Sequence, residues 1–418
     1  MIVAGSTLTL KIRDIAYRGR GVGTADGQVV FVGGVAPGET VRVRVTRVRR
    51  NFAEAVLLEV IAPSPMRIRP ACPLATAALA GAASSPPPLF CPGCAYQHLR
   101  YDEELRLKQA QFRDLLRRLG GVETAGILDP VPSPEPLGYR NKIVLHAGRT
   151  GERDVLGYLG EDNVTVVDVP SCPLAVAPID ALLRRIREED GWKAHAAEGV
   201  RLTLRWTQRD GAASWYGAAG REAGPLTEAV EPPGEFKVPR SGFAQVNTAV
   251  AGKLVSRVMD LLRLHPPSVF VDLYCGSGLL ALAAAACGVG RIVGVDSDKA
   301  AIQAARQNAA DRGLAGVEFV SAPAGSGLRR IAARADLAAS TVLVDPPRRG
   351  LDPETLEALA RVKPLRILYV SCAADTLSRD VRLLAEAGYA MTETGLLDMF
   401  PRTPYFESLT YLERADNS

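Results

Sequence analysis

Apolar and polar residues alternate along residues 1–62, between short turns rich in glycine. In the stretch TVRVRVTRV, Val41 and Val43 would face a core while Arg42 and Arg44 would face solvent, because neighbouring side chains of a strand point to opposite faces. Turns containing DG and PGE separate several stretches of this kind. Short strands joined by such turns predict a small β-barrel.

The middle of the chain combines a helix with further strands. The segment DEELRLKQAQFRDLLRRLGG begins with acidic residues, carries arginines late and ends in glycine, as amphipathic helices do. Residues 137–235 hold β-rich stretches such as NKIVLHAGR and VRLTLRW. Ahead of the helix lies a segment with cysteines and prolines, and its low-complexity insertion LATAALAGAASSPPPLF is expected to be a disordered or loosely packed loop.

From about residue 247 the pattern alternates between helix and strand. A helix at 247–263 precedes strands such as VFVDLYC, RIVGVDS, STVLVDPP and RILYVSC, with apolar helices between the first of them. This alternation predicts a parallel sheet with helices on both faces, as in Rossmann-like folds. We therefore expect a multidomain α/β protein: a barrel at 1–62, a central β-rich domain with a cysteine cluster at 63–240, and a Rossmann-like domain at 241–418.

Composition narrows the class of protein. The chain has 418 residues, 47% of them apolar, which suffices for several domains with substantial cores. Its longest apolar run, GLLALAAAACGVG, is too short to span a membrane, and the N-terminus lacks the features of a signal peptide. We expect a cytoplasmic monomer with no membrane partner, whose seven cysteines are buried or functional thiols rather than disulfides.

Positive charge is concentrated at the N-terminus. The net charge is +4 overall, yet residues 1–70 hold eleven Lys and Arg against five Asp and Glu. Arg47, at the end of the arginine-bearing stretch, and Arg49 and Arg50, directly after it, lie close to Arg42 and Arg44 in the sequence. A locally basic module favours RNA as partner, with an ordinary solvated barrel face as the alternative.

A glycine-rich turn follows the strand VFVDLYC. Gly276 and Gly278 in this turn let the backbone approach a ligand where a helix begins. Asp296 ends the next strand, a position from which an acidic residue binds ribose hydroxyls in nucleotide folds. The turn lacks a third glycine and a phosphate-binding lysine, so it favours S-adenosylmethionine over a dinucleotide. A purely structural turn is the alternative.

Two further predicted strands end in reactive side chains, Asp345 in VLVDPPRRG and Cys372 in LYVSC. In an open parallel sheet the ligand crevice lies outside the carboxyl ends of the strands, so both side chains should face it. An exposed thiol there is a candidate nucleophile. Cys275, within the glycine turn, and Cys287, at a helix end, are expected to be structural.

Several motifs, in the same order, resemble those of the RNA uracil-5-methyltransferases that depend on S-adenosylmethionine: DLYCGSG, DPPRRG, YVSCAADTLSRD and DMFPRTPYFES. Upstream, GRGVGTADGQVVFVGGVAPGE is similar to the RNA-binding TRAM barrel, and CPGCAYQH resembles the iron–sulfur motif of the family's ribosomal RNA branch. The resemblance runs from about residue 5 to 415. It implies methylation of uracil C5 in RNA, with 23S ribosomal RNA as the expected substrate.

The resemblance also implies roles for single residues. Cys372 would add to C6 of uracil as nucleophile, and Glu407 would remove the C5 proton as base. Positions that contact cofactor or target base in the family correspond to Gln245, Tyr274, Gly276, Gly278, Asp296 and Asp345. Phe243 is expected either to stack near the target base or to belong to the core.

Four cysteines correspond to the family's ligands of a [4Fe–4S] cluster: Cys72, Cys91, Cys94 and Cys172. Four thiolates also suit zinc, which stays an alternative, as does the absence of any metal. Eighteen residues separate Cys72 from Cys91, where the family has a short gap. The longer loop costs little extra entropy on closure, so a cluster remains feasible.

The chain departs from the family pattern at several positions. Ala373 and Ala374 replace a usual Asn-Pro pair, Leu279 replaces an Asn, and Tyr405 replaces a His two positions before the base. The segment SAPAG at 321–325 lacks the polar residue expected near the adenine. Three other functions stay open: the same chemistry on a transfer RNA loop, a non-catalytic RNA-binding protein with a decayed methyltransferase fold, and a cytosine-5-methyltransferase. The last usually has a second catalytic cysteine, which the DPP motif here lacks.

Overall fold

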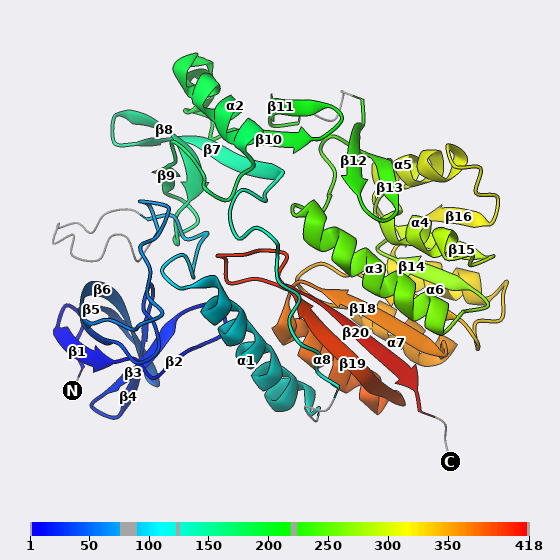
Figure 1. Cartoon of the computed structure of the whole chain (residues 1–418), viewed down its shortest axis with the longest axis horizontal. Coiled ribbons are helices and arrows are strands. Elements are labelled where there is room, and N and C mark those ends of the chain that lie inside the picture. The colour runs from blue at the N-terminus through cyan, green and yellow to red at the C-terminus, as the bar shows by residue number, and fades with distance from the viewer. Residues whose placement is uncertain (1, 76–89, 123–125, 219–223, 416–418) are drawn as a thin grey trace.

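The computed structural model describes residues 2–75, 90–122, 126–218 and 224–415 (Figure 1). Most of the low-complexity insertion, for which we expected a loose loop, lies outside the described residues. The described strands form sheets of six, five, two and seven strands. Among the helices of the described part of the chain, none combines the length and apolar character that crossing a membrane requires.

The first sheet is the predicted N-terminal barrel. Its strands are β1 (Thr7–Lys11), β2 (Asp14–Ile15), β3 (Gly21–Ala25), β4 (Gln28–Val32), β5 (Thr40–Val48) and β6 (Phe52–Ala62). They pair in the order β1-β5-β6-β4-β3-β2. Val41 and Val43 of β5 are buried, Arg42 is exposed and Arg44 is half-buried, as the alternation predicts. The valines join the apolar core that holds the strands together.

The central sheet is β-rich, as expected, and one helix packs on it. Its strands are β7 (Lys142–Thr150), β8 (Arg153–Leu159), β9 (Val166–Asp168), β10 (Arg201–Thr207) and β11 (Gly211–Tyr216), in the order β11-β10-β7-β8-β9. Helix α2 (Ala177–Glu188) buries Ile179 and Leu183 against Leu145 and Leu202 of the sheet. The chain then passes through a short 3-10 helix, η2 (Gly191–His195).

The seven-stranded C-terminal sheet is the predicted Rossmann-like sheet with an antiparallel edge. Its strands are β14 (Phe270–Leu273), β15 (Ile292–Asp296), β16 (Val317–Ser321), β17 (Thr341–Val344), β18 (Arg366–Ser371), β19 (Tyr389–Leu397) and β20 (Glu407–Arg414). Their order is β16-β15-β14-β17-β18-β20-β19. Strands β14 to β18 run parallel, whereas β20 pairs antiparallel with β18 and β19. The helix and strand alternation did not predict this antiparallel edge.

Helices cover both faces of this sheet, as Figure 1 shows. One face packs against α3 (Thr248–Leu264), α4 (Leu279–Ala286) and α5 (Lys299–Ala310). The other packs against α6 (Ala324–Ala332), α7 (Pro353–Val362) and α8 (Ala374–Glu386). Strands buried on both faces read as continuous apolar runs, which explains why their sequences were recognisable.

Helix α1 (Tyr101–Gly120) joins the barrel to the C-terminal sheet. Leu107 belongs to the barrel core, while Phe112 and Leu116 belong to the core beneath α8. The buried Lys108 ammonium lies 2.7 Å from both Glu104 and Asp398, which pairs it with the segment ahead of β20. The helix ends where Gly121 adopts a φ of 65°, a conformation that glycine takes without steric cost.

A two-stranded hairpin, β12 (Leu226–Val230) and β13 (Gly234–Val238), precedes α3. Its apolar residues, among them Val230 and Phe236, pack into the core formed by α3 and the C-terminal sheet. The division of the chain at residues 62 and 240 stays a prediction, and this packing attaches the hairpin to the C-terminal side.

Candidate active site

The turn between β14 and α4 is shaped by residues with positive φ. Tyr274, Gly276 and Gly278 have φ values of 65°, 53° and 86°. A Cβ on Gly278 would lie 3.0 Å from the Phe319 ring, so only glycine fits there without a shift. The Gly276 N–H donates to Asp296 Oδ2 at 2.9 Å, which ties the turn to the end of β15.

A cavity opens above this turn. Five of the residues expected near cofactor or base line it: Phe243, Gln245, Tyr274, Gly276 and Asp345. Gly278 and Asp296 are not among the residues that line it: Gly278 lies within the turn, ahead of α4, and Asp296 holds the turn through the Gly276 hydrogen bond. The Phe243 side chain is 74% exposed, which separates it from the core and leaves the stacking role open.

Tyr274 and Asp272 contribute polar groups around this cavity. The Tyr274 hydroxyl donates to Asp352 Oδ2 at 3.1 Å and so points towards the start of α7. Asp272 lines the cavity and is 1% exposed. Burial, together with the charge of Asp345, raises the pKa of Asp272 well above its ordinary value. The sequence analysis did not single out Asp272, although it begins the DLYCGSG motif.

Cys372 and Glu407 meet at the adjoining strand ends. Ser371, the last residue of β18, pairs with Ser408 of β20 in antiparallel register. Cys372 directly follows this pair on one strand and Glu407 directly precedes it on the other, so both lie at the same end of the paired strands, and the charge of Glu407 acts on the Cys372 thiol. Cys372 is half-buried and Glu407 is 3% exposed. The fold therefore joins the thiol and the carboxyl predicted as nucleophile and base.

The surroundings of this pair disfavour charge. Burial, followed by the charges of Glu407 and Asp345, raises the pKa of Cys372 to about 12, while the positive charge of Arg348 opposes the rise. Burial and Asp345 raise the pKa of Glu407 well above its ordinary value. Burial and the charge of Asp296 raise the pKa of Asp345 to about 7. Burial and the neighbouring carboxyl groups therefore favour the neutral forms of both the Cys372 thiol and the Glu407 carboxyl.

Arg348 is the cation of this site, and the sequence analysis missed it. Its guanidinium carbon lies 3.9 Å from the centre of the Tyr405 ring, within the range of a cation–π contact. Its charge lowers the pKa of both Cys372 and Glu407. Because Arg348 follows Asp345 in the motif DPPRRG, the sequence did contain a signal for it. Tyr405, noted as a departure from the family, holds this cation.

The four cysteines expected to bind a cluster lie in one region. Burial, followed by charge repulsion from the other three, raises the pKa of Cys94 to about 12. Gln97 bridges two of them, since its Oε1 accepts from Cys72 N–H at 2.9 Å and its Nε2 donates to Cys94 Sγ at 3.2 Å. Among the residues that the structure describes, no three His, Cys, Asp or Glu form a group that could hold a single metal ion.

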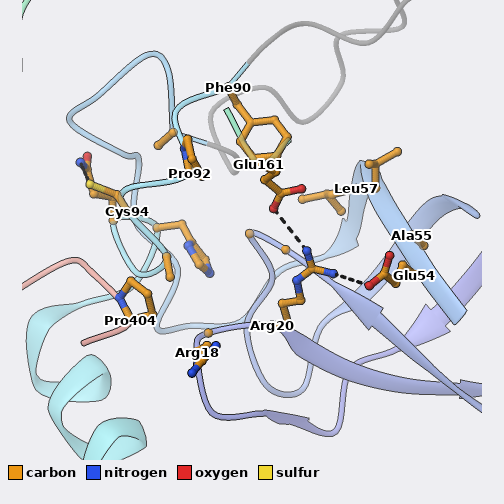
Figure 2. Close-up of a pocket in the computed structure, with 18 of the residues that line it drawn as sticks. Arg18, Arg20, Glu54, Ala55, Leu57, Phe90, Pro92, Cys94, Glu161 and Pro404 are labelled. Carbon is orange, nitrogen blue, oxygen red and sulfur yellow. Dashed lines mark hydrogen bonds and ion pairs between the residues drawn. The ribbon is translucent and has the colours of Figure 1, made fainter. Parts of the chain in front are cut away.

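A second cavity lies where the barrel meets this cysteine region (Figure 2). Arg20 crosses it, with its guanidinium 3.3 Å from both Glu54 and Glu161. Cys94 and Pro404 also line the cavity, so residues from the barrel, the cysteine segment and the loop ahead of β20 meet there. This junction connects the N-terminal region with the loop that leads to Glu407.

Comparison with known proteins is consistent with this arrangement. The family described as tRNA (Uracil-5-)-methyltransferase matches residues 234–415, and the TRAM domain family matches residues 4–58. An uncharacterized RNA methyltransferase of Thermosynechococcus vestitus is 31% identical over 98% of this chain and 98% of its own. The 23S rRNA (uracil(1939)-C(5))-methyltransferase RlmD of Alkalilimnicola ehrlichii is 30% identical, covering 97% of this chain and 96% of its own.

A solved structure is similar over the same length. The crystal structure of Pyrococcus abyssi tRNA (uracil-54, C5)-methyltransferase in complex with S-adenosyl-L-homocysteine matches with a TM-score of 0.70 and 26% identity. The match covers 97% of this chain and 100% of that one. The barrel, the central sheet and the methyltransferase sheet therefore all have counterparts among known enzymes. The chain belongs to the family of S-adenosylmethionine-dependent RNA uracil-5-methyltransferases.

Proposed function

We propose that this enzyme methylates C5 of a uracil in 23S ribosomal RNA through a covalent adduct on Cys372. The observation that carries the mechanism is the pairing of β18 with β20, which brings Cys372 and Glu407 to the same end of these strands, where the charges of Glu407 and of Asp345, the residue after β17, both act on Cys372. C5 of uracil is a weak nucleophile, so methylation needs a group that activates the ring and a base that restores it. Cys372 would be the activating nucleophile and Glu407 the base.

The proposed cycle begins with the Cys372 thiolate. Its sulfur bonds to C6, and the electrons of the C5=C6 double bond move into an enolate spanning C5, C4 and O4. When bound, S-adenosylmethionine would supply an electrophilic methyl group for C5, and the electron pair of the broken S–CH3 bond would stay on its sulfur as a neutral thioether. Glu407 then takes the C5 proton, the electrons of that C–H bond re-form the double bond, and the C6–S bond breaks to return the thiolate. Cysteine suits both ends of the cycle because it attacks and leaves readily.

The cycle requires charged forms of Cys372 and Glu407, which burial disfavours. Cys372 must lose its proton, and the positive charge of Arg348 is the feature that favours the thiolate. Glu407 must be ionised when it accepts the C5 proton, and the same arginine favours that form. Residues that line the cavity over the glycine turn, Gln245, Tyr274 and Asp345 among them, would hold the cofactor. The target uracil would enter as an unpaired or flipped base, because its edges are hidden in a helix.

Trapping tests the covalent step. RNA carrying 5-fluorouridine has no C5 proton to release, so the wild-type enzyme should accumulate a protein–RNA adduct that survives denaturation. Cys372→Ala should form none, whereas Cys287→Ala, which changes a half-buried thiol at the end of α4, should trap normally. An adduct that persists in Cys372→Ala would exclude this thiol as nucleophile.

The substrate proposal rests on relatives named for 23S ribosomal RNA. The solved structure of the Pyrococcus abyssi transfer RNA enzyme favours the second candidate, a transfer RNA loop. Incubating ribosomal and transfer RNA with methyl-labelled cofactor, and mapping 5-methyluridine, separates the two. We expect label in 23S ribosomal RNA; label confined to transfer RNA would reverse the assignment.

We also propose that four cysteines hold a [4Fe–4S] cluster: Cys72, Cys91, Cys94 and Cys172. Four cysteine thiolates are the donor set that such a cluster uses. The thiols also lie near one another, since the charges of other cysteines of this set raise the pKa of both Cys91 and Cys94. Protein purified without oxygen should be brown, absorb near ~400 nm and contain iron. Cys94→Ala should lose colour and iron, while Cys287→Ala should keep both. Colourless protein that contains zinc would favour the zinc alternative.

A further inference from the structure

The barrel touches the loop that carries the predicted nucleophile. Tyr17 and Arg18 lie between β2 and β3 of the barrel. The Tyr17 hydroxyl oxygen accepts a hydrogen bond from the backbone N–H of Ala374 at 3.2 Å. Arg18 Nη2 lies 3.1 Å from Asp375 Oδ2. Two side chains of the connection between β2 and β3 thus contact Ala374 and Asp375, the first two residues of α8, which begins directly after the segment that carries Cys372.

Helix α8 has no side-chain cap of its own, so the Tyr17 hydroxyl acts as a hydrogen-bond acceptor that the sequence of the helix does not supply. Its N-cap residue is Ala373, whose methyl group cannot accept a hydrogen bond. Helices α5 and α7 differ, because Asp298 and Asp352 accept from N–H groups of their own first turns. The first N–H groups of a helix have no partner within it. Tyr17 supplies one from another sheet, 357 positions away in the sequence.

The same tyrosine also contacts the residue beside Glu407. Its ring meets Phe406 edge to face, with ring centres 6.4 Å apart. Phe406 packs edge to face on Phe112 of α1 at 5.5 Å and is 2% exposed. Tyr17 thus contacts the first residue of α8, two positions after Cys372, and Phe406, the residue immediately before Glu407. One barrel side chain therefore bears on the relative placement of the two.

We propose that Tyr17 is a positioning residue for the methyl transfer reaction, holding the Cys372 loop and the Glu407 strand in register from the TRAM barrel. This proposal rests on the covalent mechanism given under Proposed function. It also gives the Ala374 departure a consequence. Proline, the family's usual residue there, has no N–H to donate, so the Tyr17 hydrogen bond is available to this chain because position 374 is alanine.

Removing only the hydroxyl tests the proposal. Tyr17→Phe keeps the ring contact with Phe406 but leaves the Ala374 N–H unpaired. We expect the single-turnover rate of adduct formation on 5-fluorouridine RNA to fall about 5- to 10-fold, with the dissociation constant for RNA unchanged. Tyr389→Phe is the matched control, because it removes a buried hydroxyl that donates to Pro364 O, ahead of the start of β18 and so at the opposite end of that strand from Cys372. It should leave the rate as in wild type.

A double-mutant cycle separates positioning from a general packing defect. Ala374→Pro removes the donor N–H, and proline suits this first helical position, since Ala373 already has the extended backbone, φ −142° and ψ 97°, that precedes proline. In the Ala374→Pro background, Tyr17→Phe should no longer change the rate. An equal loss in both backgrounds would overturn the proposal, because the hydroxyl would then act elsewhere.

The outcomes also distinguish this proposal from the mechanism beneath it. If wild-type enzyme fails to trap RNA through Cys372, the covalent mechanism fails and Tyr17 has nothing to position. If wild type traps and Tyr17→Phe traps at the same rate, only the positioning proposal fails. A weaker RNA dissociation constant with an unchanged rate would make Tyr17 an RNA contact and would likewise overturn it.

Discussion

Two strand-to-helix connections at one edge of the methyltransferase sheet are built in different ways. After β14, a glycine turn with positive φ leads into α4, and the neighbouring strand end supplies Asp296 to hold it. After β18, α8 begins without a side-chain cap, and Tyr17 of the barrel satisfies its first N–H. The turn proposed to hold the cofactor is thus organised by residues of the same sheet, whereas the connection after the proposed nucleophile is completed by a distant part of the chain.

Glu407→Gln should have the largest effect and tests the nucleophile end. Glutamine preserves the shape of the side chain but cannot take the C5 proton, so the methylated adduct should form and then persist. We expect turnover to fall by about 10²- to 10⁴-fold while one methyl group per enzyme is still incorporated. Quench-flow incorporation of label, with the mass of the protein–RNA adduct, measures both. Glu386→Gln, at an exposed position at the end of α8, is the control and should turn over normally. Normal turnover in Glu407→Gln would exclude Glu407 as the base.

Asp345→Asn tests the strand that lies between the two connections, since β17 pairs with both β14 and β18. The pKa of the Asp345 carboxyl rises from 3.8 in the unfolded chain to about 7 in the folded protein, mainly through burial. The folded state therefore holds a proton that the unfolded state releases, and the free energy of unfolding falls as pH rises between these values. We expect Asp345→Asn to flatten this dependence and to be more stable at pH 8 by about 2 to 4 kcal/mol.

Denaturant unfolding of the cofactor-free protein from pH 4 to 8 measures this effect. Asp129→Asn, at an exposed position, should keep the wild-type slope. Activity should be lost in Asp345→Asn in spite of the added stability, because the carboxyl group lines the cavity proposed to hold the cofactor. A slope equal to that of wild type would show that Asp345 titrates normally in the folded protein.

The same contrast explains what could be predicted from the sequence. The strand runs, the glycine turn and the ends of β17 and β18 are local patterns, and the structure has these strands and this turn where they were expected. The antiparallel strand β20 was not foreseen, because a strand following a long connection carries no local sign of its partner. The contact of Tyr17 with α8 could not be predicted either, because nothing within the barrel sequence shows that the connection between β2 and β3 packs against this helix.

Gly278→Ala tests the self-contained nature of the cofactor end. Alanine at this position would have to adopt a positive φ of 86°, and its Cβ would lie 3.0 Å from the Phe319 ring. We expect a loss of about 1 to 3 kcal/mol in unfolding free energy, measured with denaturant. Gly276→Ala, with φ 53° and nothing within 4 Å of its Cβ, is the matched variant and should lose less. Equal losses would mean that backbone strain alone, and not the contact with Phe319, requires glycine at 278.

Tyr405→Leu should have the smallest effect and tests whether Tyr405 holds Arg348 near Cys372. Leucine removes the ring under Arg348, so the guanidinium is no longer held near Cys372 and Glu407. The contact is partly exposed, and its loss should slow trapping about 5-fold at neutral pH. Because Arg348 lowers the pKa of Cys372, releasing it should move the rise of rate with pH to higher pH. Tyr405→Phe retains the ring and should behave as wild type. Trapping rates from pH 6 to 10 decide the matter: a slower rate with an unmoved profile would mean that Tyr405 contributes packing alone, without fixing the charge that favours the thiolate.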